Sequence, residues 1–375
     1  MNILRILIIF HLSILVGCSS DDRTKARIDE VLMPLDAMLK ADPSGRTAQT
    51  YLNKEWLPSR TIQPYFYEVS QALKESSPAR DERVRKVEQW MTPYEQSLIN
   101  VLLTSQNLSG IPNAACGYLQ FAAPTPAVHD ALLAVARSPD ALPQYAAEAY
   151  DTLFMLDMGD PEVAKEVIEL IEGRDAKSAR SPVGDALMGK VVRWARPEMK
   201  SMYLQLLSVS YEPENFTTSG GRARLISNYQ RSFEGLKAFG KLDDSVISMM
   251  RERLSEVPLE EEPDFHRLAR DPLLIAEGKL RPEPVVNLKG QLLGISQEVY
   301  PSWLAAHPDD EKTEIIRQSK RHPEEAVNKL RNSATEIGSS LSAPNDATRA
   351  NLLPLWLALG IGSLVAILLY RLSKK

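Results

Sequence analysis

The sequence predicts an all-α protein: a solenoid of helical hairpins followed by one C-terminal transmembrane helix. Through most of the chain, apolar residues recur at spacings of three and four, which is the period of a helix with one buried face. Pro126, Pro161 and Pro197 open successive helices at intervals of 35 and 36 residues, close to the length of a helical-hairpin repeat. The stretch from Ala350 to Tyr370 carries no charge, which predicts a membrane span.

Residues 1–17 have the pattern of a secretory signal peptide. Arg5 precedes an apolar run from Ile6 to Val16, which is too short to span a bilayer and has the length of a signal-peptide core. The run ends in Leu15-Val16-Gly17-Cys18, followed by polar residues. These residues resemble the lipobox of bacterial lipoproteins, and the resemblance implies cleavage before Cys18 and diacylglycerol on its sulfur. An uncleaved N-terminal anchor is the alternative.

Residues 350–371 are predicted to form the transmembrane helix. About 20 apolar residues at 1.5 Å per residue cross a hydrocarbon core of ~30 Å. Arg371, Lys374 and Lys375 follow, and positive residues favour the cytoplasmic side. We therefore expect a cytoplasmic tail at 372–375 and an extracytoplasmic, periplasmic body. A cleaved sorting tail is the alternative, although no sortase-like Leu-Pro-x-Thr-Gly motif precedes the helix.

Both predicted anchors attach the mature chain to the plasma (inner) membrane. In the lipoproteins that the chain resembles, a serine such as Ser19 after the cysteine usually permits export to the outer membrane. A retained transmembrane helix would prevent that export. We therefore expect the membrane as a partner at two places, through the lipid on Cys18 and through residues 350–371.

The middle of the chain divides into a helical lead-in at 18–110 and repeats at 111–257. A helix from Pro143 ends at Met158-Gly159-Asp160-Pro161, and a second helix then runs to Gly173. Asp and Pro begin helices by capping and by a preset φ, and Gly ends them. This unit resembles a HEAT repeat over about 30 residues, and the resemblance implies a stacked solenoid. An irregular helical bundle is the alternative.

After residue 257 the character of the sequence changes. Residues 258–332 are predicted to be an acidic, proline-flanked linker and a helical hairpin. Within them, 280–295 contains two prolines and two glycines, which predicts either a short β-hairpin or a loop. Residues 333–349 are rich in Ser, Ala, Asn and Thr and are predicted to be a flexible juxtamembrane linker.

Charge and cysteine content restrict the partners. The net charge of -5, with no basic cluster beyond Lys374 and Lys375, argues against nucleic acid as the main partner. If Cys18 is lipidated, Cys116 is the remaining cysteine, which excludes an intrachain disulfide. We expect Cys116 to be a small buried hydrophobe. Four tryptophans at apolar helical positions are expected in the core: Trp56, Trp90, Trp194 and Trp303.

One segment has the pattern of a catalytic motif. His307-Pro308-Asp309-Asp310-Glu311 resembles the signature of zinc-dependent N-acetylglucosaminyl deacetylases. The resemblance implies zinc bound by His307 and Asp310, with Asp309 as general base. The surroundings differ from that family, because no Gly-rich turn follows and the only later histidine is His322. The competing interpretation is a helix start, with proline in the first turn and carboxylates at the positive end of the helix dipole.

Three functions are compatible with these patterns. The leading hypothesis is a non-enzymatic module without a cofactor, which binds a protein or peptide through its repeats. The second is a cell-envelope zinc-dependent hydrolase that uses His307 and Asp310. The third is a structural spacer of the envelope. Zinc content separates the second from the other two, and deletion of the repeats with both anchors kept separates binder from spacer.

Overall fold

The computed structural model describes residues 20–67, 78–172, 181–212 and 219–307. In this part of the chain the regular elements are all helices, and the one β-type pairing is an isolated bridge between Val286 and Leu292. The all-α prediction is confirmed there. None of the helices in these ranges is both long and apolar enough to cross a membrane. The predicted signal peptide at 1–17 and the predicted transmembrane helix at 350–371 lie outside the described residues.

The helices follow one another with short connections. In chain order the α-helices are α2 (Ser20–Leu32), α3 (Leu35–Ala41), α4 (Arg46–Glu55), α5 (Gln63–Tyr67), α6 (Pro78–Met91), α7 (Glu95–Thr104), α8 (Ala114–Leu119), α9 (Pro126–Ala136), α10 (Pro143–Met155), α11 (Pro161–Glu172), α12 (Pro182–Leu187), α13 (Met199–Ser208), α14 (Ser219–Leu236), α15 (Asp244–Glu256), α16 (Pro263–Ala276) and α17 (Ser296–Ala306). Short 3-10 or π segments complete them: η1 (Pro58–Ile62), η2 (Thr92–Tyr94), η3 (Val191–Arg193) and η5 (Lys237–Phe239).

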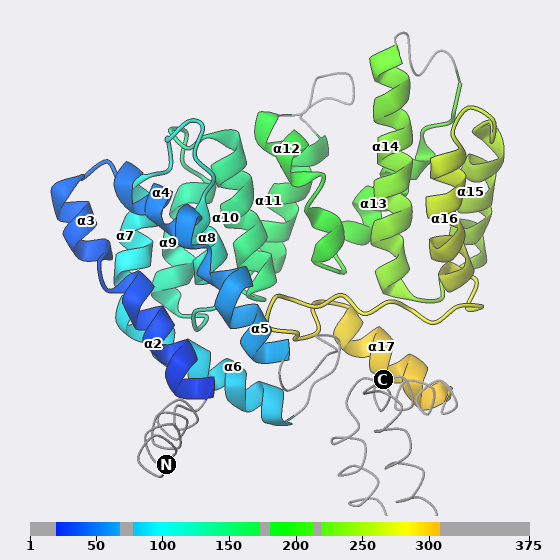
Figure 1. The fold of residues 1–375 in the computed structure, drawn as a ribbon. Coiled ribbons are helices and arrows are strands. Elements are labelled where there is room, and N and C mark those ends of the chain that lie inside the picture. The colour runs from blue at the N-terminus through cyan, green and yellow to red at the C-terminus, as the bar shows by residue number, and fades with distance from the viewer. Residues whose placement is uncertain (1–19, 68–77, 173–180, 213–218, 308–375) are drawn as a thin grey trace, which may run out of the picture. The chain divides into compact units, whose positions relative to one another are not determined.

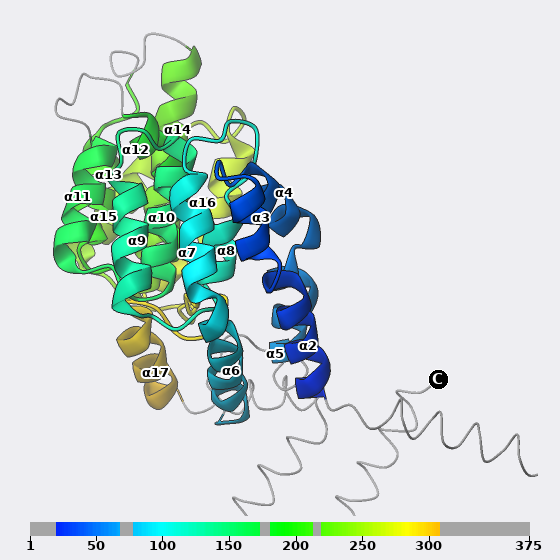
Figure 2. The same cartoon turned by 90° about the vertical axis from the view of Figure 1, so that its left-hand side faces the viewer.

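The helices α3 and α4, and then α7 to α16, alternate between two layers, whereas α5 and α6 lie at one edge of them (Figures 1 and 2). In the odd layer, α3 packs on α7, α7 on α9, α11 on α13 and α13 on α15. In the even layer, α4 packs on α8, α8 on α10, α10 on α12 and α14 on α16. Consecutive helices also pair across the layers, as α9 does with α10 and α13 with α14. Each helix thus buries one stripe against its sequence neighbour and another against the next hairpin, as stacked repeats require.

The layers extend beyond the expected repeat boundaries of 111 and 257. The hairpin α3/α4, within the predicted lead-in, continues both layers because α3 packs on α7 and α4 on α8. At the other end, α16 packs on α14 and α15 and completes a last hairpin. The sequence 258–262, expected to begin a linker, is a short turn inside the array. The array therefore runs from about residue 35 to Ala276.

Local capping explains where the helices begin. The Asp160 carboxylate accepts from the backbone N–H of Val163 at 2.8 Å, and α11 starts at Pro161 as predicted. Thr125 caps α9 in the same way, with Pro126 at the first helical position. The third proline differs, because α13 begins two residues after Pro197. The apolar spacing of 183–195 also predicts one helix, but the structure interrupts it: α12 ends at Leu187 and η3 begins at Val191, after Gly189.

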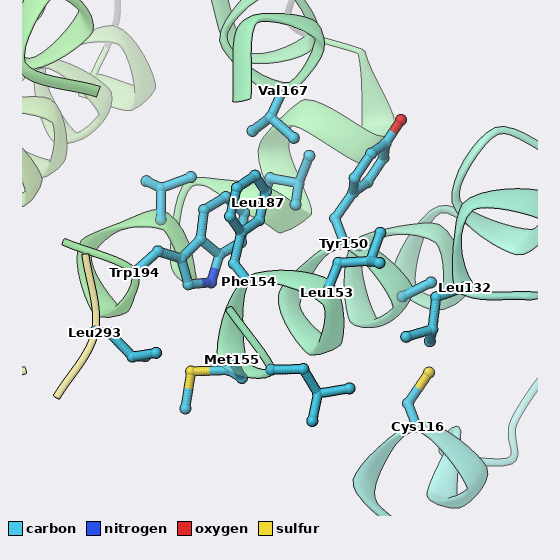
Figure 3. Packing of buried hydrophobic residues seen from close by; sticks show 14 of the residues in the cluster. Cys116, Leu132, Tyr150, Leu153, Phe154, Met155, Val167, Leu187, Trp194 and Leu293 are labelled. Atoms are coloured by element: carbon cyan, nitrogen blue, oxygen red, sulfur yellow. The ribbon is translucent and has the colours of Figure 1, made fainter. Parts of the chain in front are cut away.

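The core runs between the layers along the array. Figure 3 shows part of it, where the Phe154 ring of α10 stacks on the Trp194 ring with centroids 4.2 Å apart and planes 18° apart. Such an offset aromatic pair adds about 0.5–1.5 kcal/mol beyond the burial of its area. Leu293, which follows α16 by 17 residues, belongs to the same buried cluster. Trp194 is fully buried, as predicted.

After α16 the chain turns back along one edge of the array (Figure 1). We call residues 280–295 the return segment. It crosses three turns of the array. Glu283 accepts from Lys237 Nζ of η5 at 3.1 Å, the Ile295 N–H donates to the Ala195 carbonyl at 2.7 Å, and Lys289 Nζ donates to the Ala122 carbonyl at 2.7 Å. Of the two structures expected for 280–295, the tight turn of a small hairpin is present, closed by the isolated bridge.

Candidate functional site

The residues of the predicted zinc site are not brought into a cluster within the described part. His307 is exposed and directly follows α17, while Asp310 and Cys18 lie outside the described residues. In the ranges that the structure describes, no group of three or more His, Cys, Asp or Glu side chains is placed to hold a metal ion. Lipidation of Cys18 and zinc binding by His307 and Asp310 therefore remain predictions.

Cys116 is buried, as predicted. It lies on α8, and its Sγ accepts a hydrogen bond from Asn113 Nδ2 at 3.2 Å. Burial raises the pKa of the Cys116 thiol far above its usual range, because a thiolate would lose its hydration there. The thiol stays protonated and packs as a small hydrophobe.

The two layers present different surfaces. On α11, Glu162, Lys165 and Glu169 are exposed along the odd layer. In the middle of the even layer the helices expose far less: α8 is buried except for Gly117, and α10 exposes Gln144 alone. The groups that stay accessible around these buried helices are few and mostly polar or charged, and a small number of placed polar groups is what gives a binding site its specificity. The even layer is therefore the candidate binding face.

Trp56 lies at the end of the even layer, and the prediction that it is in the core is wrong. Its side chain is 37% exposed, and its backbone adopts φ 40°, which is left-handed. The ring rests over Gly117, where an added Cβ would meet its edge at 3.7 Å. A left-handed bulky residue costs about 1–2 kcal/mol, so packing on α8 must hold it there.

A charged cluster occupies the middle of the even layer. We call Glu148, Asp151, Lys190, Arg193 and Arg231 the inner charged cluster. Asp151 is 2% exposed; Arg193 Nη2 donates to its carboxylate at 2.5 Å, and Lys190 Nζ lies 3.7 Å away. Lys190 Nζ also donates to Glu148 at 2.7 Å. These bonds join α10 to the segment around η3 and so fasten one hairpin to the next.

Trp194 completes the bonding of Asp151. Its Nε1 donates to the second carboxylate oxygen of Asp151 at 2.8 Å. The buried carboxylate thus has donors on both oxygens, as a buried charge requires. The same tryptophan stacks on Phe154, so the apolar core and the charged cluster share one side chain.

Arg231 differs from the other members of the cluster. It lies on α14, half-buried, and no acceptor among the described residues is within hydrogen-bond distance of its guanidinium. It lies beside Gly189, since Arg231 Nη2 is 3.9 Å from the place where a Cβ would stand on that glycine. Lys190 and Arg193 balance the charges of Glu148 and Asp151, so Arg231, beside Gly189, adds one positive charge. A guanidinium with free donors suits a carboxylate or backbone carbonyls of a partner.

A second polar site lies beneath the return segment. It is a cleft of about 520 Å³ between that segment and the turns after α8 and α10. Lys289 lies at its wall, 2% exposed, and its Nζ donates to Glu88 Oε1 at 2.6 Å and to the Ala122 carbonyl at 2.7 Å. Burial lowers the pKa of Lys289, and the Glu88 carboxylate opposes that shift. Asn287 Oδ1 holds the turn by accepting from the N–H groups of Lys289 and Gln291, each at 2.9 Å.

Sequence reasoning missed both polar sites. The return segment was expected only as a loop or hairpin, and nothing in its letters pairs Lys289 with Glu88, 201 residues away. The available signal was local: Asn287-Leu288-Lys289-Gly290 is a turn sequence, and Gly290 has φ 76°. The inner charged cluster had no comparable signal, because its members come from three separate segments.

The comparisons with known proteins add no relative. No family model matches the chain, and no curated protein or solved structure matches it either.

Proposed function

We propose that this chain is a membrane-tethered, extracytoplasmic binding or scaffold protein, whose HEAT-like α-solenoid binds a protein or peptide partner on the even layer. One observation supports this most. Consecutive helices alternate between two layers, and in the middle of the even layer α8 and α10 are almost wholly buried beside a charged cluster. An elongated face built from many repeats is the surface that solenoid proteins use for recognition.

The HEAT-like identity is proposed from the sequence of α10 and α11. These helices and their Gly-Asp-Pro turn have the order that resembles a HEAT repeat, and Asp160 caps α11. In the structure α10 pairs with α9 and α11 with α12, so the two helices belong to neighbouring hairpins. Neighbouring hairpins place their prolines at the same edge, where the return segment crosses them. This arrangement supports a solenoid over an irregular bundle.

The tether is proposed from the two ends of the sequence. A lipid on Cys18 and a helix at 350–371 would attach the chain twice to the plasma membrane, with the body outside the cytosol and residues 372–375 inside. A single acyl chain gives weak, reversible attachment, whereas the two chains of a diacylglycerol anchor a protein stably and a transmembrane helix inserts almost irreversibly. The pair would therefore keep the solenoid permanently near one bilayer.

The partner chemistry follows from Arg231. Its guanidinium has no acceptor in the described part of the chain, and the surrounding cluster is positive by one charge. The proposed partner is therefore a protein segment that brings a carboxylate to Arg231 on α14. Each charge-assisted hydrogen bond of this kind contributes about 1.5–3 kcal/mol.

Site-specific photocrosslinking in cells tests the proposal. Benzoylphenylalanine is placed at Ser227 or Gln144, exposed on the even layer, and at Lys165 or Ser201, exposed on the odd layer, as matched controls. We expect a discrete protein adduct from the even-layer positions only. Adding Arg231→Gln should weaken that adduct several-fold while the amount of folded chain stays constant. Equal adducts from both layers, or none from either, would overturn the proposal.

A further inference from the structure

We infer that one edge of the array, formed by the start of α2 and by α6, lies directly on the headgroups of the bilayer. The inference rests on the proposed lipid at Cys18. It goes further by stating which surface of the folded body faces the membrane and that the lipid surface is its partner.

The reach of the chain carries the argument. Only Ser19 stands between Cys18 and Ser20, where α2 begins. Two extended steps of about 3.3–3.6 Å separate the Cα atoms of Cys18 and Ser20 by at most about 7 Å. A cysteine whose acyl chains are in the bilayer sits at its surface, so the first turn of α2 must sit there too. By contrast, 43 residues separate Ala306 from Ala350, so the second attachment imposes no such limit.

The first turn of α2 is fixed to the folded body. Asp21 Oδ1 accepts from the Tyr65 hydroxyl at 2.8 Å, and Asp21 Oδ2 accepts from Lys86 Nζ at 2.8 Å. These bonds, to Lys86 first and then Tyr65, hold the pKa of Asp21 below its usual value. Farther along the helix, Ile28 and Val31 are fully buried. Because α2 cannot swing away from α6 without losing these contacts, a short tether on Cys18 positions the whole array.

The same edge also carries α6 and the end of α17, as both views show (Figures 1 and 2). Exposed side chains there have both charges, including Asp22, Arg23, Glu82 and Arg85. A mixed charged surface suits the phosphate and ammonium groups of phospholipids and does not favour entry into the hydrocarbon core. The edge is therefore expected to rest on headgroups. The opposite edge, with the turn between α7 and α8, then faces away from the membrane.

Depth-dependent quenching tests this arrangement on the full, lipidated chain in phosphatidylethanolamine–phosphatidylglycerol vesicles that contain headgroup-nitroxide lipid. A fluorophore is attached at Arg85→Cys, or at Asn107→Cys in the turn between α7 and α8 as the control; both positions are exposed, and Cys116 is buried. We expect strong quenching at 85 and little at 107. Equal quenching at both positions, or none at 85, would overturn the inference.

A linker insertion separates the inference from the proposed function. Twenty Gly/Ser residues between Ser19 and Ser20 add a mean reach of about 25 Å. The chain should still float with the vesicles, while quenching at 85 falls to the level at 107. Quenching at 85 that survives the insertion contradicts the reach argument. If mass spectrometry finds no lipid on Cys18 in the chain without the insertion, the proposed tether itself is wrong.

Discussion

At the scale of single residues, Lys289 is a buried charge that fixes where the return segment packs. Its ammonium bonds a carboxylate of α6 and a carbonyl after α8, and so joins the return segment to the start of the array. Removing one partner of a buried pair leaves the other charge without compensation, whereas removing both leaves an apolar site. The Lys289–Glu88 pair therefore favours the fold in which the return segment packs against α6.

We predict that Glu88→Gln lowers the free energy of unfolding by about 2–3 kcal/mol. This loss is smaller than is usual for a fully buried ion pair, because the Glu88 side chain is 21% exposed. Adding Lys289→Met should restore most of the loss, since no unpaired ammonium remains. Urea unfolding of the detergent-solubilised chain measures both. Glu82→Gln is the control, because that side chain is 58% exposed and its loss should change stability by less than about 0.5 kcal/mol. A double variant as unstable as Glu88→Gln would refute this account.

Residue-scale predictions from the sequence succeeded where the cause was local. Asp160 and Pro161 begin α11 by interactions within four residues, and the small neighbours of Cys116 indicated burial. The prediction for Trp56 failed because its left-handed backbone turns the ring onto the surface of α8 beside Gly117, 61 residues away. Arg231 carried no sequence signal, because its lack of an acceptor is a property of the assembled layer.

At the scale of elements, the position of the return segment depends on the close backbone contact between Gly294 and Ala195. Gly294 has φ 47°, and a Cβ there would stand 2.2 Å from the carbonyl oxygen of Ala195. Ala195 itself is left-handed, with φ 51°, which turns that carbonyl toward the Ile295 N–H. A side chain at 294 would force the segment away from the turn after η3.

Gly294→Ala and Gly110→Ala form a matched pair. Both glycines have positive φ, but a Cβ at Gly110 would meet nothing within 4 Å. We expect Gly110→Ala to cost about 1 kcal/mol of strain, and Gly294→Ala to cost about 1–3 kcal/mol more from overpacking. Thermal unfolding gives the difference, and limited proteolysis within 280–295 should become faster only in Gly294→Ala. Equal effects of the two variants would show that the contact does not hold the segment.

Element positions were predictable in proportion to the strength of their local signals. Periodicity and turn prolines located α9 to α11, because capping and amphipathic spacing act within one helix. They failed at 183–195, where Gly189 lies between α12 and η3, and they gave no sign that 280–295 crosses the array. That crossing is fixed by contacts between distant segments, which no window of sequence contains.

At the scale of the whole molecule, the sequence predicted an all-helical fold, and the layered array includes helices on both sides of 111–257. The array takes in α3/α4 before residue 111 and α16 after residue 257, because stacking continues wherever a neighbour offers an apolar face. The proposed function adds a location to this array: two attachments at one bilayer, with the solenoid outside the cytosol. A permanently tethered binder would meet its partner at a raised local concentration.

The most direct test of the account is thiol labelling of spheroplasts with a membrane-impermeant maleimide. Ser248→Cys places a reactive thiol on the exposed side of α15, and Lys375→Cys places one in the predicted cytoplasmic tail. The unsubstituted chain is the control, since Cys116 is buried. We predict labelling at 248 in intact spheroplasts and at 375 only after permeabilisation. Labelling at 375 in intact spheroplasts, or protection of 248 until permeabilisation, would contradict the account.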